Sequence, residues 1–356
     1  MDKSSLQKII DVIQSKSRLV ARGGQSKTGI QYPPDTDTLD LSSLTGIVEY
    51  NPSEYTFTAL AGTRLSEINR MLAEHAQFLP FDPPFEKDGA TLGGTVAANL
   101  SGPLRYHYGG VRDFILGVNF LDSQGQLIRS GGKVVKNAAG FDIPKLMVGS
   151  LGRFGAMIEL SFKVFPKPHE YITLIASYAN MLEALDKLVE LTNSSAEILA
   201  LDIEPVGKIY NLMVRLGGDP KLFSERKTKL HHILEGIEVY EGEDEASIWD
   251  DIKDFRWVPD DAILVKVPII PKHVPQLDEL LSNSGSERRY SGGANVAWIA
   301  CSGTTSLLDQ ILHKINLSGL SIIGNSEQVR LGKWERNSFY AKIKSALDPS
   351  GLWVEV

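Results

Sequence analysis

Two short glycine-rich segments hold the residues of this sequence best suited to binding a ligand. They read Arg-Gly-Gly-Gln-Ser at residues 22–26 and Ala-Thr-Leu-Gly-Gly-Thr at residues 90–95. Paired glycines let a backbone turn with positive φ and bring successive N–H groups close to an anion, because no Cβ stands in the way. Nests of N–H groups stabilise negative charge through oriented dipoles, and the hydroxyls of Ser26, Thr95 and Ser101 add donors. Each pair alone is more often just a turn, but the functional interpretation is a cradle for a pyrophosphate.

The better-known phosphate motifs are missing from the sequence. The segment 149–155 carries three glycines, but their spacing differs from the G-x-G-x-x-G of a dinucleotide-binding turn. The segment 302–306, Ser-Gly-Thr-Thr-Ser, lacks the lysine of a P-loop. A Rossmann domain and a P-loop are therefore disfavoured, and we expect an anion held by backbone N–H groups without a lysine.

The first half of the chain, up to about residue 168, contains the elements that must position these glycines. Residues 55–59 alternate with a period of two, which predicts a half-buried strand. Leu65, Ile68 and Leu72 then fall on one face of a helix, for which Thr63 is the candidate N-cap. Further strands are expected at 114–121 and 156–165, the second of which is ended by prolines. This half is predicted to be mixed α+β.

From about residue 170 the pattern changes to strands alternating with amphipathic helices. One unit runs through a strand at 171–178, a helix at 181–191 and a strand at 198–203. A second unit runs through a strand at 262–267, a helix at 274–281 and a strand at 296–300. Two such units in tandem suggest an α+β sandwich of ferredoxin-like type. The domain boundary is expected at residues 166–169.

Composition and charge exclude several classes of protein. A chain of 356 residues exceeds the length at which one core usually stops growing, so two domains are expected. A net charge of −7 offers no positive field for a nucleic acid. With Cys301 as its single cysteine, the chain cannot supply a disulfide, a Cys-rich zinc site or the ligands of an iron–sulfur cluster, and no metal site is expected. Neither the amino-terminal residues nor the apolar stretch at 262–270 predicts a signal peptide or a transmembrane segment. We expect a cytoplasmic protein, or one held at the inner face of the membrane through a complex.

The joint pattern of these segments resembles the FAD-binding domain of the vanillyl-alcohol oxidase family, also called the PCMH type. It consists of the strand and turn at 55–63, Asp-Pro-Pro at 82–84, TLGGTVAANLSGP, and the long run from RYHYGG to FPKP, in that order over about the first 170 residues. Within that family, KNAAGFD followed by MVGSLGRFG is most similar to the flavin subunits of glycolate oxidase and bacterial D-lactate dehydrogenases. The short second half points to the smaller of the glycolate oxidase flavin subunits.

The resemblance implies roles for individual residues around a bound FAD. The first pyrophosphate loop would consist of Arg22, Gly23, Gly24, Gln25 and Ser26, and the second of Gly93, Gly94 and Thr95, with Pro83, Thr91 and Leu92 beside them. Ala98, Ser101, Gly102 and Gly109 would line the passage to the ribityl chain and isoalloxazine, and Ile158 would meet the adenine side. Arg105, Asp113 and Asn137 are expected to brace these loops.

Two departures from the family pattern bear on the cofactor. Members that bind flavin covalently have a histidine at the position of Gln25 or a cysteine in the second loop, and this chain has neither. The FAD is therefore expected to be non-covalent. The turn at 348–352, Asp-Pro-Ser-Gly-Leu, differs from the Asn-Pro-Gly segment of related chains, which leaves open whether it contacts the flavin.

Three residues are candidates for catalytic roles. Oxidation of a 2-hydroxy acid by a flavin needs a base for the hydroxyl proton and a cation for the carboxylate. The family's His-x-Gly-x-Gly-x-x-His motif is missing from the second domain. His107, in the loop RYHYGG, is the candidate base, and Arg256 and Lys266 are the candidate cations. The alternatives are an exposed loop histidine and two solvated surface cations.

Three domain segments and three functions follow as expectations. A PCMH-type FAD-binding domain of two α+β subdomains, split near 50–60, would occupy residues 1–168, an α+β cap residues 169–330, and a helix with a tail residues 331–356. The chain would bind FAD within a glycolate oxidase complex, next to a larger flavin subunit and an iron–sulfur subunit that takes the electrons. The alternatives are a self-contained D-lactate or glycolate dehydrogenase and a structural subunit without catalysis.

Overall fold

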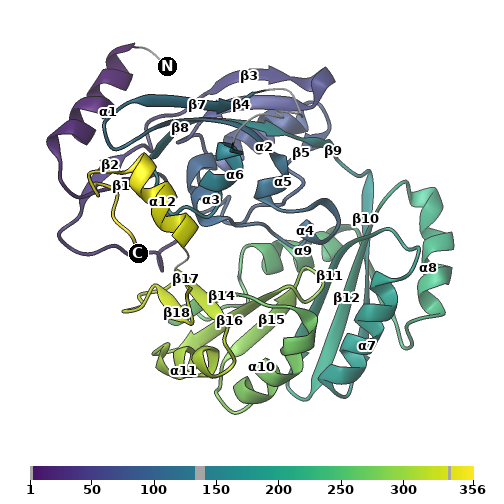
Figure 1. Ribbon diagram of the computed structural model, residues 1–356. Helices are drawn as coiled ribbons and strands as arrows, with labels where there is room; N and C mark the ends of the chain where they lie inside the picture. Colours follow the sequence, from purple (N-terminus) through teal and green to yellow (C-terminus); the bar gives the residue numbers. More distant parts are fainter. Residues whose placement is uncertain (1–2, 133–140, 336–337) are drawn as a thin grey trace.

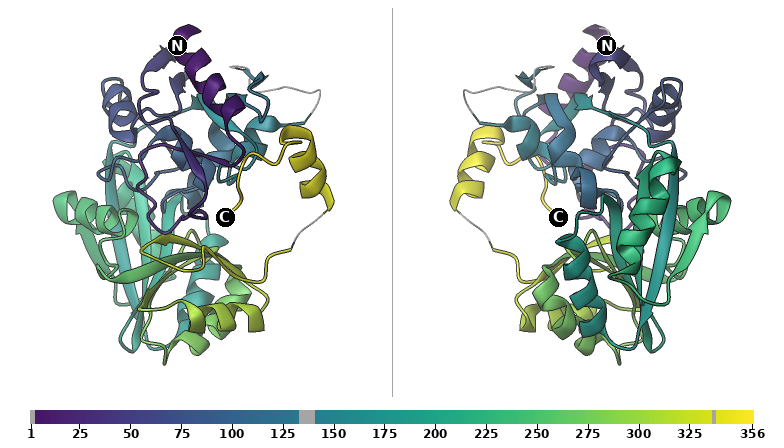
Figure 2. Two further views of the ribbon diagram at one scale, coloured as in Figure 1. Left: turned by 90° about the vertical axis from the view of Figure 1, so that its left-hand side faces the viewer. Right: turned by 90° about the vertical axis from the view of Figure 1, so that its right-hand side faces the viewer.

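The computed structural model describes residues 3–132, 141–335 and 338–356, and it divides the chain between two main sheets (Figure 1). In the view of Figure 1, the elements of the first half lie above and those of the second half below. Helix α12 (Ser338–Leu347) returns to the first half and lies beside it, away from the sheet that precedes it (Figure 2).

The first half contains a five-stranded antiparallel sheet in the order β3-β4-β8-β6-β7. Its strands are β3 (Ile47–Asn51), β4 (Thr56–Leu60), β6 (Ile115–Leu121), β7 (Leu127–Gly131) and β8 (Ala156–Lys163). Two pairs lie outside it: the parallel β1 (Leu19–Arg22) and β2 (Asp37–Asp40), and the antiparallel β5 (Gln77–Phe78) and β9 (Phe165–Pro166). The helices are α1 (Lys3–Ser15), α2 (Leu65–Ala73), α3 (Leu92–Ala98), α4 (Arg105–Tyr108), α5 (Val111–Phe114) and α6 (Ile143–Met147), with a 3-10 turn at Pro52–Glu54.

The second half builds one antiparallel sheet in the order β13-β10-β12-β11-β15-β16-β14-β17-β18. Its strands are β10 (Glu170–Tyr178), β11 (Ile198–Val206), β12 (Ile209–Gly218), β13 (Glu238–Glu241), β14 (Ala262–Pro268), β15 (Glu287–Ser291), β16 (Val296–Ser302), β17 (Ser318–Ile323) and β18 (Arg330–Gly332). Its helices are α7 (Met181–Thr192), α8 (Phe223–His231), α9 (Gly242–Lys253), α10 (Val274–Leu281) and α11 (Ser306–Lys314), with 3-10 turns at Pro220–Leu222 and Pro271–His273.

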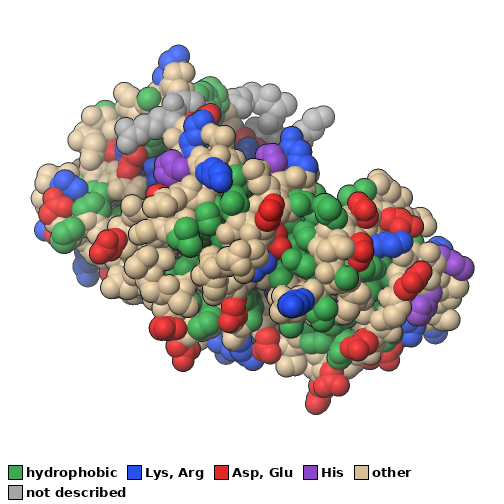
Figure 3. Space-filling model, turned by 90° about the horizontal axis from the view of Figure 1, so that it is seen from below, with side chains coloured by type: hydrophobic (Ala, Val, Ile, Leu, Met, Phe, Trp, Pro, Cys, Tyr) green, Lys and Arg blue, Asp and Glu red, His purple; other side chains and the backbone are tan. Residues whose placement is uncertain are grey.

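This sheet is two ferredoxin-like units joined edge to edge. The elements β10-α7-β11-β12-α8-β13 form one βαββαβ unit, and β14-α10-β15-β16-α11-β17 form the other. The two units meet where Ile203 of β11 pairs with Tyr290 of β15. The α+β class and the ferredoxin-like character predicted from the sequence are confirmed. On the face of the molecule seen from below, acidic and basic side chains are interspersed (Figure 3).

The two faces of β14 pack against different halves of the molecule. Ile263, Val265 and Val267 point into the core beneath α7, α10 and α11, whereas Leu264 joins the core of the first half. Side chains alternate along a strand, so Lys266 lies on the same face as Leu264. Val296, Trp298 and Ile322 share that apolar contact with the first half. The two halves therefore meet across a packed face of the nine-stranded sheet.

Two sequence predictions in the first half are wrong in detail. Strand β4 is buried on both faces, because Phe57 enters the core while Thr58 bonds to Ser161 on the neighbouring strand (2.8 Å between hydroxyl oxygens). Thr63 does not cap α2. Its hydroxyl bonds to the backbone of Gly46, and Arg64 takes the N-cap position without a side-chain bond.

The domain limits remain a proposal, and the structure bears on one of them. The expected split near residues 50–60 falls inside the β3–β4 hairpin, whose strands pair from Ile47 to Leu60. The chain changes sheet earlier, between Asp40 and Ile47. We propose that any division of the first half lies there.

The segment after α12 packs against the first strand. Trp353 is 1% exposed and pairs in parallel with Leu19 of β1, which accepts from Val354 N (3.0 Å) and donates to Leu352 O (2.8 Å). The carboxylate of Asp348 accepts from the N–H groups of Leu352 and Trp353 and pairs with Lys344 at 2.7 Å. The segment thus extends the small β1–β2 sheet.

Candidate cofactor site

A cleft of about 470 Å³ lies where β1 ends and α3 begins. It is lined by the loop of residues 21–32 except Gly29, by Thr91, Gly94, Ala97 and Ala98, and by Leu151 and Gly152. The predicted site residues Arg22, Gly23, Gly24, Gln25, Ser26, Thr91, Gly94 and Ala98 are all among them. Gly93 lines a small adjoining pocket together with Arg22 and Gly152. The two glycine segments therefore share one site.

The glycines are required because each of them packs directly against a neighbouring segment. A Cβ added at Gly24 would lie 2.0 Å from the carbonyl oxygen of Gly89, and one at Gly23 would lie 2.4 Å from the hydroxyl of Thr91. A Cβ at Gly93 would lie 2.9 Å from the carbonyl oxygen of Ala61. Side chains at these positions would push the loops apart. Gln25 follows with φ of 52°, in the left-handed region.

The two loops differ in how they use their N–H groups. The backbone N–H groups of residues 23–28 make no hydrogen bond to any other described residue. In the second loop, Leu92 N and Gly93 N donate to Thr63 O (2.9 Å) and Ala61 O (2.8 Å), and Gly94 N donates to the Thr91 hydroxyl (3.3 Å). Only the first loop thus offers a run of free donors to an anion.

Lys27 supplies a cation that the sequence argument did not expect. Its Nζ bonds to the Ser26 hydroxyl (3.1 Å), stands 5.7 Å from the Phe85 ring centre, and would lie 3.8 Å from a Cβ on Gly94. Burial lowers the pKa of Lys27 to about 8, and Asp88 offsets part of that effect. Lys27 therefore stands between the two loops. The position of Lys27 directly after the first glycine loop is the sequence feature that could have indicated this role.

Aromatic and backbone contacts hold the part of the cleft around Arg22, Tyr32 and Leu151. The Tyr32 hydroxyl donates to Leu151 O (3.1 Å), and burial raises the pKa of Tyr32. The Arg22 guanidinium stands 5.2 Å from the Tyr32 ring and donates to the Gln25 side chain at 3.1 Å. Arg22 Nε is buried and has no partner among the described residues. An unpaired buried donor is expensive, so it points to a ligand that would accept from it.

The other predicted cofactor residues lie outside this cleft. Pro83 lines a second cleft, and Leu92 and Ile158 are buried in apolar cores. Ser101 and Gly102 line a small void between the halves, where the Ser101 hydroxyl accepts from Val111 N (3.1 Å). Gly109 lies in a turn beside Asp113, and Thr95 is buried with no hydroxyl partner among the described residues. Asn137 lies outside the described residues.

The three catalytic candidates lie in different surroundings. His107 is exposed on α4, with its ring edge-on to Tyr108 at 4.7 Å. Arg256 is half exposed and pairs with Asp251 at 2.8 Å. Lys266 is 7% exposed and donates from Nζ to Asn99 O at 2.6 Å. Burial, together with a smaller effect of the positive charge of Arg105, lowers the pKa of Lys266 to about 7. The solvated alternative for Lys266 is wrong.

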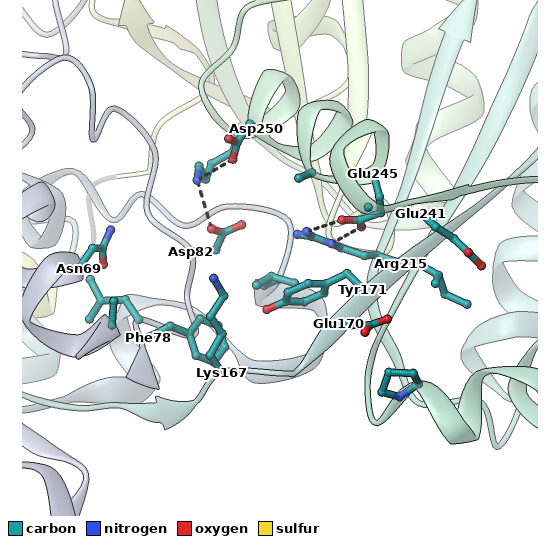
Figure 4. Close-up of a pocket in the computed structure, with 18 of the residues that line it drawn as sticks. Asn69, Phe78, Asp82, Lys167, Glu170, Tyr171, Arg215, Glu241, Glu245 and Asp250 are labelled. Carbon is teal, nitrogen blue, oxygen red and sulfur yellow. Dashed lines mark hydrogen bonds and ion pairs between the residues drawn. The ribbon is translucent and has the colours of Figure 1, made fainter. Parts of the chain in front are cut away.

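A larger cleft of about 850 Å³ lies elsewhere, between the segment 77–86 and helices α8 and α9 (Figure 4). At its wall the Arg215 guanidinium donates to both carboxylate oxygens of Glu245, at 2.8 and 3.1 Å. Lys253 stands 3.3 Å from Asp250 and 3.9 Å from Asp82. The charges at these two positions are already paired within the protein.

The described part of the chain holds no group of three or more His, Cys, Asp or Glu side chains that could bind a metal ion. Across residues 3–132, 141–335 and 338–356, the helices are all too short or too polar to cross a bilayer.

The amino-terminal part of the chain is similar to known proteins in sequence, and the whole chain is similar in fold. Residues 2–131 match the protein family described as FAD binding domain. Alkyldihydroxyacetonephosphate synthase has a similar fold, with a TM-score of 0.70 at 15% identity over 98% of this chain and 74% of that one. The match covers residues 2–131 and indicates FAD as the cofactor, which the cleft with its free N–H groups and Lys27 fits.

Several curated proteins are similar in sequence over part of their length. The glycolate oxidase subunit GlcE of Escherichia coli is 40% identical over 185 residues, which are 52% of this chain and 53% of that protein. The glycolate oxidase subunit GlcD of Bacillus subtilis is 32% identical over 44% of this chain and 33% of that protein. The D-lactate dehydrogenase of Anaerostipes hadrus is 29% identical over 41% and 30%, respectively. The chain thus spans about half the length of these relatives, or less.

Proposed function

We propose that this chain is the FAD-binding subunit of a glycolate oxidase, a 2-hydroxy acid dehydrogenase complex. It binds FAD non-covalently and takes part in the oxidation of glycolate to glyoxylate, in which the flavin accepts the electron pair. Support comes from the FAD-binding domain and from the similarity to GlcE and GlcD. The observation that carries the proposal is the run of N–H groups without a described partner in residues 23–28, which line the cleft together with the Lys27 side chain.

In this proposal each part of the cleft has a task. The free N–H groups and the Lys27 ammonium hold the pyrophosphate, because both place positive charge beside its oxygens. Thr91 fixes the start of α3 beneath the glycine pair. Gln25 cannot form a bond to the flavin ring, and neither histidine nor cysteine lines the described cleft. The cofactor is therefore exchangeable.

A role within a complex is favoured over a self-contained enzyme. Cys301 is buried, and the described residues hold no group of three or more His, Cys, Asp or Glu side chains that could bind an electron-carrying metal. We propose that a larger flavin subunit and an iron–sulfur subunit are the partners, in the cytoplasm or at the inner membrane face. The self-contained dehydrogenase is the first alternative, with His107 or another group as its base. A structural subunit without catalysis is the second alternative.

The experiment is anaerobic reduction of the flavin by glycolate. The purified chain should be yellow, should release FAD on heat denaturation, and should be bleached by glycolate only when the partner subunits are present. Fast bleaching of the isolated chain would favour the self-contained enzyme. A colourless protein that takes up no FAD when supplied in excess would overturn the proposal.

A further inference from the structure

A buried carboxylate lies where the two ferredoxin-like units join, on the face of the sheet that turns toward the first half. Asp202 of β11 is fully buried. Its Oδ1 accepts from the Ser291 hydroxyl (2.9 Å) and from Gly292 N (3.0 Å). Its Oδ2 is buried and has no partner among the described residues. An ionised oxygen is costly in such a place, whereas a proton on Asp202 removes the charge.

The strand register brings one arginine to two carboxylates. The residue pair that joins β11 to β15 points into the core beneath the helices. The strand neighbours of that pair, Asp202, Glu204 and Arg289, therefore share the opposite face. Arg289 Nη2 donates to Glu204, and Arg289 Nη1 lies 3.2 Å from Sδ of Met213, the β12 residue that pairs with Asp202. The guanidinium thus reaches across β11 beside both acids.

Arg289 cannot neutralise both carboxylates. It is 3% exposed, and its Nε is buried without a partner among the described residues. The Glu204 side chain is 30% exposed, so it keeps contact with water. Burial raises the pKa of Asp202 to about 6, an effect that Arg289 opposes and Glu204 reinforces. Asp202 is therefore the acid of this cluster that takes up a proton.

The other titratable side chains on the neighbouring elements leave Arg289 and Glu204 as the charges that act on Asp202. Three cations bind acids elsewhere: Arg215 with Glu245, Arg288 with Asp278, and Lys253 with Asp82 and Asp250. The remaining titratable positions on β12, β15 and α4 are Tyr210, Glu287, Tyr290, Arg105, Tyr106, His107 and Tyr108.

Helix α4 of the first half covers the turn that Asp202 holds. It packs against β11. A Cβ added at Gly293 would lie 2.8 Å from Cε2 of Tyr106, and one added at Gly292 would lie 3.4 Å from Cγ of Arg105. The turn is therefore enclosed between β11 and α4. Because α4 belongs to the first half, the burial of Asp202 depends on the contact between the two halves.

We propose that the contact of α4 with β11 is a proton-sensitive latch between the two halves, closed while Asp202 is protonated and loosened when it ionises. Water stabilises a carboxylate, and water gains access to Asp202 when α4 moves away. Proton binding and opening are therefore linked. The inference goes beyond the proposed function, because the latch requires no flavin.

The sign of this linkage follows from the raised pKa. The proton favours the closed arrangement fully below the ordinary aspartate pKa of 3.8, and this advantage is lost as the pH rises through about 6. The latch is thus tighter in mild acid than at neutral pH.

The test is hydrogen exchange of the full chain, read by mass spectrometry and corrected for the intrinsic exchange rate at each pH. The amides of residues 104–110, which include α4, are compared with those of β8 in the five-stranded sheet. The variants are Asp202→Asn, which is neutral at every pH, and Glu204→Gln. The control is Asp278→Asn, which changes a buried acid whose oxygens are bonded by Tyr210, Arg288 and Tyr290.

We expect the protection of the α4 amides to fall about tenfold from pH 5 to pH 7 in the wild type, because the pKa of Asp202 differs by that much between the closed and the open arrangement. Protection of β8 should change less. Asp202→Asn should keep α4 protected at both pH values, and Asp278→Asn should follow the wild type. Glu204→Gln should move the fall to lower pH, since Arg289 then acts on Asp202 alone. It repeats the test should Asp202→Asn fail to fold.

Protection of α4 that stays constant between pH 5 and pH 7 would overturn the latch. An equal fall in β8 would also overturn it, because the proton would then act on unfolding of the whole chain. So would a fall in Asp202→Asn equal to that of the wild type, since another group would then be responsible. The proposed function does not depend on these outcomes, because flavin binding is measured separately.

Discussion

The two clefts of this protein differ in what they do with their own charges. In the larger cleft, Arg215 is bound by both oxygens of Glu245 and lies 4.2 Å from the ring centre of Tyr171. In the smaller cleft, the N–H groups of residues 23–28 and Arg22 Nε have no partner among the described residues. Size alone would favour the larger cleft as the binding site, whereas the unpaired hydrogen-bond donors favour the smaller cleft. The binding site of this protein is recognised by polar groups that the fold leaves without partners.

The first prediction separates the two clefts by stability. Glu245→Ala should lower the free energy of unfolding by about 3–5 kcal/mol, because it leaves the buried Arg215 cation unpaired. FAD affinity of the folded fraction should stay as in the wild type. Chemical denaturation and flavin titration measure the two quantities.

The matched control for that prediction is the double variant Arg215→Met with Glu245→Leu. It should recover most of the lost stability, since an apolar pair replaces the ion pair. A loss of FAD affinity in the folded Glu245→Ala protein would show that the larger cleft takes part in cofactor binding.

The second prediction concerns the closest backbone approach in the smaller cleft. Gly24→Val should weaken FAD binding about hundredfold or more, because its Cβ would lie 2.0 Å from Gly89 O and separate the loops. Gly132→Val is the control, since a Cβ there meets no described atom within 4 Å. Flavin fluorescence on titration gives both dissociation constants. Equal affinities would contradict the cradle.

The third prediction tests the cation between the loops. Lys27→Met should weaken FAD binding about tenfold at pH 7. The folded-state pKa of Lys27 is lowered to about 8, so the ammonium persists below that pH and is lost above it. Wild-type affinity should therefore fall as the pH rises past about 8, and a bound pyrophosphate would shift that fall to higher pH.

The variant that removes Lys27 should show no such dependence on pH. Lys87→Met, at a largely exposed lysine paired with Asp254, serves as the control and should follow the wild type. Parallel pH profiles for all three proteins would count against a role for Lys27.

The fourth and smallest effect is expected at the cap of α3. Thr91→Ala should lower the free energy of unfolding by about 1 kcal/mol, because its hydroxyl accepts from Gly94 N. FAD affinity should change about twofold. Thr91→Ser keeps the acceptor and should restore both values. Thermal unfolding with and without FAD provides the measurement.

Local patterns predicted much of the fold. Helix α10 begins and ends at the predicted residues, Val274 and Leu281, because its apolar spacing and the proline in its first turn, Pro275, are local signals. The glycine pairs likewise indicated their loops, because only glycine allows these backbone approaches. The sequence analysis did not predict strand β15 or the second helix–strand crossover of each ferredoxin-like unit. Their residues alternate less clearly, and their pairing is set by distant strands.

What the sequence could not supply were contacts between distant segments. Thr63 reads as a helix cap, but Gly46 lies close enough in the fold to take its hydroxyl. Lys266 reads as a solvated surface residue, but β14 is central, and its face is covered by the first half. Lys27 became a site residue only because Gly94 is folded against it. Each case depends on packing between residues far apart in the chain.

The pairing of Leu19 with Trp353 has a consequence for biosynthesis. Strand β1, which leads into the Arg22 loop, gains this neighbour only after the ribosome has synthesised the residues of both main sheets. Until then, β1 has β2 as its partner and lacks the large indole that covers it. We therefore expect nascent chains stalled before residue 348 to capture little flavin, which release from stalled ribosomes in the presence of FAD would measure.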